Sequence, residues 1–160
     1  MYTIIVADDE EEIRRGIISK VNWEKIGFRV IGEASNGAEA LELVEKLDPD
    51  LLLTDIQMPF LSGIELAREV REIKPMVQIA FLSGYDDFSY AQQAIQYNIV
   101  KYLLKPISSR ELEVELSQIK QLIDDKFERF TSVEQAMKHG EQAEFILSLL
   151  WRCRCLWWCW

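Results

Sequence analysis

Short apolar runs alternate with segments of helical periodicity along this chain, and the alternation is the strongest constraint on its fold. Apolar runs of this length, bounded by turn residues, are typical of buried parallel strands. The connections between them are short enough for right-handed crossovers. The pattern predicts an α/β fold with a doubly wound, five-stranded parallel sheet in the order 2-1-3-4-5. The expected strands are Ile4–Ala7, Phe28–Ala34, Asp50–Asp55, Val77–Leu82 and Ile99–Leu104.

Helices are expected between and after these strands, over about residues 10–21, 38–47, 62–75 and 88–96, and from 108 onward. Ser62 is the expected N-cap of the third helix, and either Ser108 or Ser109 that of the fifth. The third helix is expected to bury a stripe made of Ile64, Ala67, Val70 and Ile73.

Apolar positions continue from Leu112 to Met137 at spacings of mostly four and three, so the fifth helix is expected to extend beyond the first domain. We expect a domain over 1–125 and a helical linker extension over 126–150. The extended helix is either one amphipathic helix packed on the domain or a linker that pairs with its twin in a coiled coil.

The last ten residues, 151–160, contain four Trp and three Cys and do not resemble the rest of the chain. A metal site built on these cysteines lacks a fourth ligand nearby. We interpret the segment as an out-of-frame or cloning-derived tail and exclude it from the fold.

The net charge of −9 excludes one class of partner for the first domain. All of this charge lies in residues 1–130, and so acidic a surface would be repelled by a phosphate backbone. No apolar stretch reaches membrane-spanning length, and the N-terminus lacks the features of a signal peptide. These features predict a cytoplasmic protein that binds neither nucleic acid by itself nor a membrane.

Polar side chains gather where the expected strands end. Asp8 and Asp9 follow the first strand and Asp55 ends the third, while Ser83 and Lys105 follow the fourth and fifth. In the predicted order, these strand ends share one rim around the switch point of the sheet. Three converging carboxylates repel one another, and a hard divalent cation such as Mg²⁺ relieves that repulsion.

This combination favours phosphoryl transfer to a carboxylate. Asp55 would be the nucleophile, Lys105 a positive charge for the incoming group and Ser83 a hydroxyl donor. No Gly-rich loop follows the first strand, so the dinucleotide fingerprint and the P-loop are both absent.

Taken together, Asp8-Asp9, Asp55, Ser83 and Lys105-Pro106 resemble the receiver domain of bacterial two-component response regulators, over residues 1 to about 125. The resemblance implies a flavodoxin-like fold in which Asp55 accepts phosphate from a sensor histidine kinase. It implies that Asp9 ligates Mg²⁺ directly, that Asp8 assists partly through water, and that Asp55 and the backbone carbonyl of Gln57 complete the protein ligands.

The same resemblance assigns the remaining roles. Lys105 pairs with the phosphoryl group across a cis Lys105-Pro106 bond, Ser83 moves toward that group, and Tyr102 turns inward as a switch residue. The output surface is helix 4, strand 5 and helix 5, and a homodimer through this surface or through the extended helix 5 is expected.

Two segments resemble one subgroup of these regulators. Residues 22–28 and 83–88 are similar to regulators with an arabinose-regulator-type helix-turn-helix output domain. This chain lacks that domain, so any DNA binding is expected through a longer parent protein.

Two alternatives stand beside the switch. One is an interaction module of the same fold that works without phosphate. The other is a Mg²⁺-dependent aspartyl-phosphate phosphatase, which needs a second Asp where this chain has Gln57. We expect a signalling switch that catalyses only its own phosphorylation and dephosphorylation, not a turnover enzyme on an external substrate.

Overall fold

A five-stranded parallel sheet in the order β2-β1-β3-β4-β5 forms the centre of the first part of the chain. The computed structural model describes residues 1–84 and 96–138. The predicted fold class and strand order are confirmed. The strands are β1 Tyr2–Ala7, β2 Phe28–Ala34, β3 Leu51–Asp55, β4 Gln78–Ser83 and β5 Lys101–Leu104.

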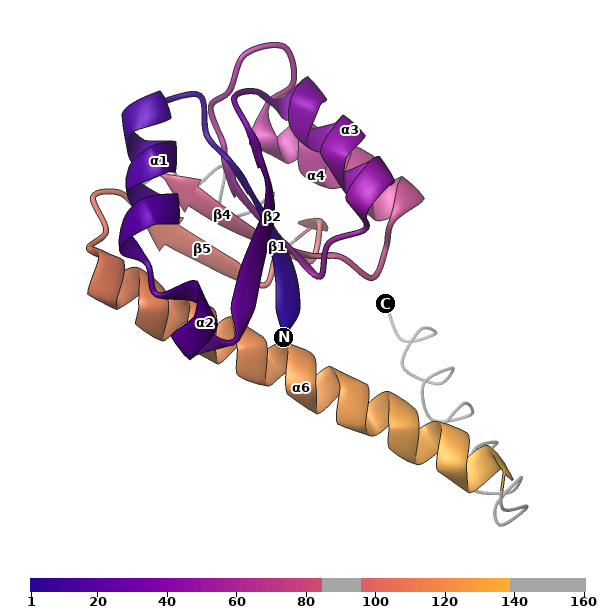
Figure 1. Cartoon of the computed structure of the whole chain (residues 1–160). Helices are drawn as coiled ribbons and strands as arrows, with labels where there is room; N and C mark the ends of the chain where they lie inside the picture. The colour runs from indigo at the N-terminus through magenta and orange to yellow at the C-terminus, as the bar shows by residue number, and fades with distance from the viewer. Residues whose placement is uncertain (85–95, 139–160) are drawn as a thin grey trace, which may run out of the picture. The chain divides into compact units, whose positions relative to one another are not determined.

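Helices cover both faces of this sheet. Figure 1 shows α3 and α4 on one face, with α1 and the first part of α6 on the other. The helix expected over 88–96 falls almost wholly outside the described residues. The described helices are α1 Glu11–Lys20, α2 Trp23–Ile26, α3 Gly37–Leu47, α4 Gly63–Ile73 and α6 Ser109–Lys138.

The central strand β3 is buried along its whole length. Successive side chains of a strand point to opposite faces, so every second residue joins the same layer. Leu52, Ile79 and Phe81 belong to the cluster under α3 and α4, and all three are 0% exposed. Burying one such side chain stabilises the fold by about 1.5–3 kcal/mol, so the sheet is a rigid platform for what its strand ends carry.

Helix starts follow the expected capping chemistry. Ser62 and Glu65 form a capping box at α4. At α6, the Ser108 hydroxyl accepts a hydrogen bond from the Glu111 amide at 3.2 Å, and the Glu111 carboxylate accepts one from the Ser108 amide at 2.9 Å. Ser108, not Ser109, is therefore the cap of this helix.

Two details differ from expectation. Ile73 is 40% exposed, so its place in the buried stripe was wrong. It is the last residue of α4, where the helix ends before another turn can cover it. The connection between α1 and β2 contains the short helix α2, whose Asn22 cap accepts a hydrogen bond from the Lys25 amide. A single helical turn is too short to leave a periodic signal in the sequence.

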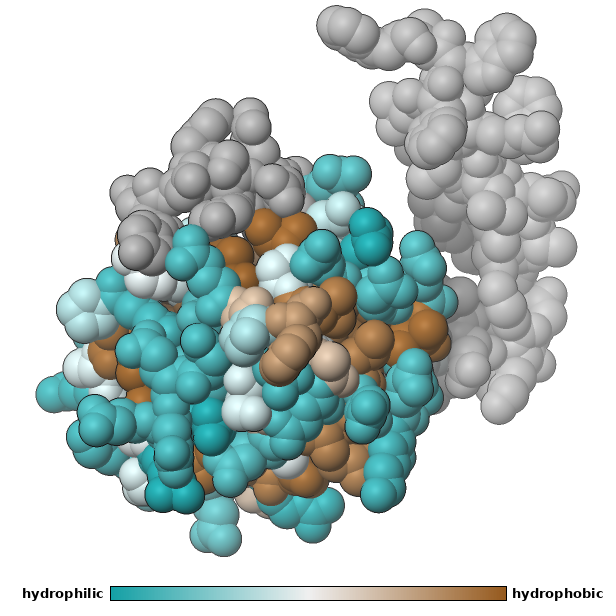
Figure 2. Space-filling view, turned by 90° about the horizontal axis from the view of Figure 1, so that it is seen from above, coloured by the Kyte–Doolittle hydropathy of each residue, from teal (hydrophilic) through white to brown (hydrophobic). Residues whose placement is uncertain are grey.

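The chain divides into two compact units, Met1–Gln121 and Leu122–Trp160. Helix α6 runs without interruption to Lys138, and residues 139–160, including the unusual tail, lie outside the described residues. Across the described residues, no helix is both long and apolar enough to cross a membrane. Viewed from above, hydrophobic residues appear as patches between hydrophilic ones (Figure 2).

Candidate functional site

The parallel strands bring the predicted carboxylates to one edge of the sheet. Ala7 pairs with Thr54 across β1 and β3, so Asp8 and Asp9 begin their loop beside Asp55. The three side chains each offer a carboxylate oxygen within 4.8 Å of the others. Asp8 is 1% exposed and Asp55 7%, whereas Asp9 faces solvent. The sequence prediction that these three residues converge agrees with this geometry.

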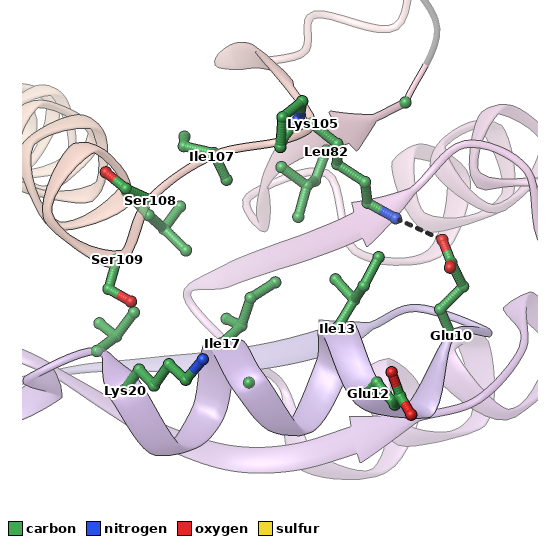
Figure 3. Close-up of a pocket in the computed structure, with 15 residues that line it drawn as sticks. Glu10, Glu12, Ile13, Ile17, Lys20, Leu82, Lys105, Ile107, Ser108 and Ser109 are labelled. Atoms are coloured by element: carbon green, nitrogen blue, oxygen red, sulfur yellow. Dashed lines mark ion pairs between the residues drawn. The ribbon is translucent and has the colours of Figure 1, made fainter.

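Lys105 lies among these carboxylates. Its Nζ is 2.8 Å from Asp8 Oδ2, 3.1 Å from Asp55 Oδ2 and 3.7 Å from Glu10 Oε1. Figure 3 shows Lys105 reaching from the end of β5 toward Glu10 at the start of α1. Only 11% of the lysine side chain is exposed, so these attractions act in a partly desolvated setting where charges interact strongly.

Burial and charge shift the two central groups in the same direction. Desolvation raises the pKa of Asp55, although the Lys105 charge and hydrogen bond oppose it. Burial lowers the pKa of Lys105, but the Asp8 hydrogen bond and the charges of Asp55 and Asp8 outweigh this, so the net shift is upward. Lys105 therefore stays a cation at neutral pH, and its charge favours the ionised form of Asp55 against the cost of burial.

The site opens to solvent through a cavity of about 240 Å³. The predicted residues Asp9, Asp55, Gln57, Ser83 and Lys105 all line it, together with Glu10 and Gly84. A groove of about 650 Å³, also lined by Lys105 and Glu10, lies between α1 and the connection from β5 to α6 (Figure 3).

Two predicted residues, Asp8 and Tyr102, are not part of this lining; Asp8 is buried beneath it and contacts Lys105, whereas Tyr102 lies on β5. It pairs with Phe81 in the register of β4 and β5 and packs, partly buried, against the core cluster. Ser83, by contrast, is 1% exposed, and its carbonyl accepts a hydrogen bond from the Lys105 amide at 2.7 Å. The Lys105-Pro106 peptide bond is cis, as the family resemblance implied.

Two glycines allow close backbone approaches around the loop that follows Asp55. A Cβ on Gly63 would lie 2.0 Å from the Asp55 carbonyl oxygen, and one on Gly37 would lie 2.0 Å from the Leu61 carbonyl oxygen. Side chains are therefore excluded at both positions. The Ile56 amide also donates to Asp55 Oδ1 at 2.6 Å, which leaves Oδ2 facing Lys105.

Sequence reasoning missed two contributors. Glu10, at the start of the first expected helix, is not among the predicted site residues, although it lies two residues beyond Asp8 and 3.7 Å from Lys105. Arg14 is a buried charge in α1 and donates to the Asp8 carbonyl at 2.6 Å. A charged residue next to Ile13 on an otherwise apolar helix face was the signal that could have identified it.

The donor set suits a hard divalent cation. Asp8, Asp9 and Asp55 supply only carboxylate oxygens, and a buried carboxylate such as Asp8 needs a positive partner. Oxygen ligands at one or two carboxylates, with water in the other positions, are what Mg²⁺ takes in proteins. The residues present therefore fit this ion.

Known proteins of this kind share both the sequence pattern and the fold. The family described as the response regulator receiver domain matches residues 4–117. The transcriptional regulatory protein YesN of Bacillus subtilis, described as uncharacterized, is 40% identical over 119 residues, which cover 74% of this chain and 32% of that protein. HptR of Staphylococcus aureus, a transcriptional regulatory protein, is 36% identical over 119 residues, covering 74% of this chain and 46% of its own length. The chain thus spans a third to a half of these relatives.

Solved structures agree. The receiver domain of the response regulator AraT from Geobacillus stearothermophilus superposes with a TM-score of 0.73 at 36% identity, covering 78% of this chain and 97% of that one. A two-component transcriptional regulator described as AraC, from Clostridium phytofermentans, gives 0.71 at 34% identity, with coverage of 78% and 97%. The predicted family resemblance is confirmed, and receiver domains are signalling modules, not turnover enzymes. By its sequence, its strand order and the side chains at its strand ends, this chain belongs to the family of response regulator receiver domains.

Proposed function

We propose that this chain is a phosphorylation-dependent switch in which Asp55 accepts a phosphoryl group from a sensor histidine kinase. The observation that carries the proposal is the contact of one lysine with two buried carboxylates at adjoining strand ends, 2.8 Å from Asp8 and 3.1 Å from Asp55. A purely structural ion pair needs one carboxylate for one lysine, whereas here two carboxylates share Lys105, and Asp55 and Lys105 line an open cavity. A phosphoacceptor needs positive charge beside it both before and after transfer.

The transfer step follows from these positions. An Asp55 carboxylate oxygen forms a bond to phosphorus, the bond between phosphorus and the donor imidazole nitrogen breaks, and that nitrogen keeps the electron pair and takes up a proton. Lys105 pairs with the new phosphoryl oxygens, because its raised pKa keeps it protonated. Ser83, at the end of β4, supplies a hydroxyl to the same group.

Asp8, Asp9 and Asp55, with the backbone carbonyl of Gln57, would hold Mg²⁺. When bound, this ion neutralises charge on the phosphoryl group. The Asp9 carboxylate is the most exposed of the three and the most accessible to an incoming ion. Gln57 is exposed and lines the cavity, so its side chain would affect how fast water attacks the phosphoryl group.

Phosphate at Asp55 would bias a two-state equilibrium through Ser83 and Tyr102. Tyr102 lies on β5, next to β4, and is only partly buried. The output surface we propose comprises the helix expected over 88–96, β5 and the start of α6; the first of these lies almost wholly outside the described residues.

The readout we propose is control of transcription through a DNA-binding output domain of a longer protein. The names of YesN and HptR, both transcriptional regulatory proteins, support this, as does the share of their length that this chain leaves uncovered. We further propose that residues 126–150 act as a helical linker and that α6 contributes to a homodimer. The exposed Leu122 and Phe127 on α6 support that role.

Incubation of the protein with Mg²⁺ and acetyl phosphate, followed by intact-mass measurement, tests the acceptor. Wild type is expected to gain the mass of one phosphoryl group, and Asp55→Asn is expected to gain none. Asp48→Asn is the matched control, because it makes the same Asp-to-Asn replacement at an exposed residue seven positions earlier. This variant should still gain one phosphoryl group. An unmodified wild type, or an adduct that persists in Asp55→Asn, would contradict the proposal.

Beryllofluoride with Mg²⁺, a stable mimic of the phosphoryl group, tests the dimer. Sedimentation velocity should show a shift toward the dimer in wild type and none in Asp55→Asn. A monomer that stays monomeric while carrying the adduct would remove dimerisation from the proposal and leave the acceptor role intact.

A further inference from the structure

Arg14 is a buried charge that the acceptor chemistry described above does not use. It lies on α1 with 9% of its surface exposed, one residue before Arg15, which faces solvent. Burying a guanidinium is costly unless its N–H groups find partners. Arg14 has two partners: its Nη1 donates to the Asp8 carbonyl at 2.6 Å, and its Nε donates to Glu33 Oε2 at 3.3 Å.

Asp8 is held at several of its polar atoms. Its amide donates to the Ala34 carbonyl at 3.1 Å, and its Oδ1 accepts from the Glu10 amide at 3.0 Å. Arg14 holds the third, the carbonyl oxygen. That carbonyl belongs to the planar peptide unit between Asp8 and Asp9, so fixing it also fixes the direction in which the Asp9 backbone continues.

We propose that Arg14 is a positioning residue of the metal site. By holding the Asp8 carbonyl, it orients the Asp8–Asp9 peptide so that both carboxylates converge on Asp55. Its contact with Glu33, at the end of β2, anchors the guanidinium to the sheet, which supplies the rigidity. The inference rests on the proposed Mg²⁺ site and names a residue outside its ligand set.

Partners that orient ligands without touching the ion have a measurable role. Removing such a residue elsewhere typically weakens metal binding 10- to 100-fold. Mg²⁺ is the sensitive probe, because it demands near-ideal octahedral geometry, whereas Ca²⁺ tolerates irregular coordination. Loss of positioning should therefore weaken Mg²⁺ more than Ca²⁺. Loss of a nearby positive charge would instead strengthen the binding of both ions.

The experiment is isothermal titration of the full chain with MgCl₂ and, separately, with CaCl₂. Arg14→Met is expected to weaken Mg²⁺ binding by about tenfold and Ca²⁺ binding clearly less. Arg15→Met is the matched control: this neighbour has a side chain 72% exposed in an ion pair with Glu11. Its variant should keep both affinities within about twofold, as expected for a surface ion pair.

Two further variants keep the test decisive. Arg14→Lys retains the charge, but its single nitrogen cannot replace the guanidinium fork that reaches both the Asp8 carbonyl and Glu33, so its Mg²⁺ affinity should lie between wild type and Arg14→Met. It also serves if Arg14→Met fails to fold. Glu33→Gln keeps an acceptor oxygen for Arg14 Nε and leaves the Asp8 contact in place, so it should bind Mg²⁺ nearly as wild type does.

The melting temperature with and without Mg²⁺ separates the possible results. A variant of Arg14 that melts lower in EDTA but binds both ions with wild-type affinity has only a structural role, and that result overturns the inference. Equal weakening for Mg²⁺ and Ca²⁺ overturns it as well. If wild type itself binds no Mg²⁺, the metal site of the proposed function fails, and this is visible before any variant is compared.

Discussion

Replacing Arg71 should destabilise the domain far more than replacing its exposed neighbour Arg68. Arg71 lies on α4 and donates to four backbone carbonyls in two other segments. Its Nε reaches the Tyr97 carbonyl at 2.8 Å and its Nη2 the Asn98 carbonyl at 3.0 Å, while Nη1 contacts the carbonyls of Pro75 and Val77. One guanidinium therefore connects α4 to the residues just before β4 and to the turn before β5.

The magnitude follows from which of these bonds are shielded from water. The bonds to Tyr97 and Val77 are partly buried, and those to Pro75 and Asn98 are exposed. Water can replace the exposed pair, so we count the two shielded bonds at about 1.5 kcal/mol each, the lower end for charged donors. Burial lowers the pKa of Arg71, because the charged guanidinium is partly removed from water. Arg71→Met removes this desolvation cost, which offsets part of the lost hydrogen bonding. The net loss for Arg71→Met should be about 2–3 kcal/mol.

Urea unfolding of Arg71→Met and Arg68→Met measures the difference. The Arg68 side chain is 53% exposed and pairs with the adjacent Glu69, so its variant should lose at most about 0.5 kcal/mol. Equal unfolding midpoints for the two variants would refute the reasoning, because they would show that the four carbonyl contacts contribute nothing net.

Three further predictions concern the site and its loop. Phe60 has a φ of 67° and is 89% exposed. Phe60→Asn should raise the free energy of unfolding in urea by about 1 kcal/mol, because Asn tolerates the left-handed region better than Phe does. No gain in stability would show that the backbone at Phe60 is not strained. Gly63→Ala should slow phosphorylation by acetyl phosphate and lower the melting temperature, because its Cβ would lie 2.0 Å from the Asp55 carbonyl oxygen. Gly16→Ala is the control: its Cβ would meet nothing within 4 Å, so it should stabilise helix α1 and leave the phosphorylation rate unchanged. Burial raises the pKa of Asp55, so the folded state binds this proton more tightly than the unfolded state does. Without Mg²⁺, the free energy of unfolding of wild type should therefore fall relative to that of Asp55→Asn as pH rises from the ordinary pKa of Asp through the raised one. Parallel curves of stability against pH for the two proteins would contradict this.

Much of the fold was predictable because its signals are local. Each strand is a short apolar run, and each capped helix has a recognisable start, as at Ser62. Parallel strands need crossovers, and crossovers of one hand restrict the strand order to a few choices. Once the order is known, Asp8, Asp9 and Asp55 must share an edge of the sheet. Their meeting could therefore be predicted without coordinates.

Other features depended on which neighbouring segments a side chain faces, and a sequence does not encode this. Ile73 continues the apolar period of α4 yet is exposed, because burial at a helix end depends on what lies opposite it. Tyr102 was predicted to act with Ser83, but it lies outside the lining of the site cavity and packs against the core. Its switch role remains a prediction.

The sequence by itself determined the alternation of strands and helices, and with it the edge at which the acidic residues, Ser83 and Lys105 would gather. Only the tertiary structure decided which carboxylates contact the lysine, and which atoms the buried Arg14 contacts. Arg14 and Arg15 are chemically identical and differ only by one step of helix rotation. That step turns Arg14 toward the Asp8 carbonyl and Arg15 toward solvent, and packing against the sheet is what sets the rotation.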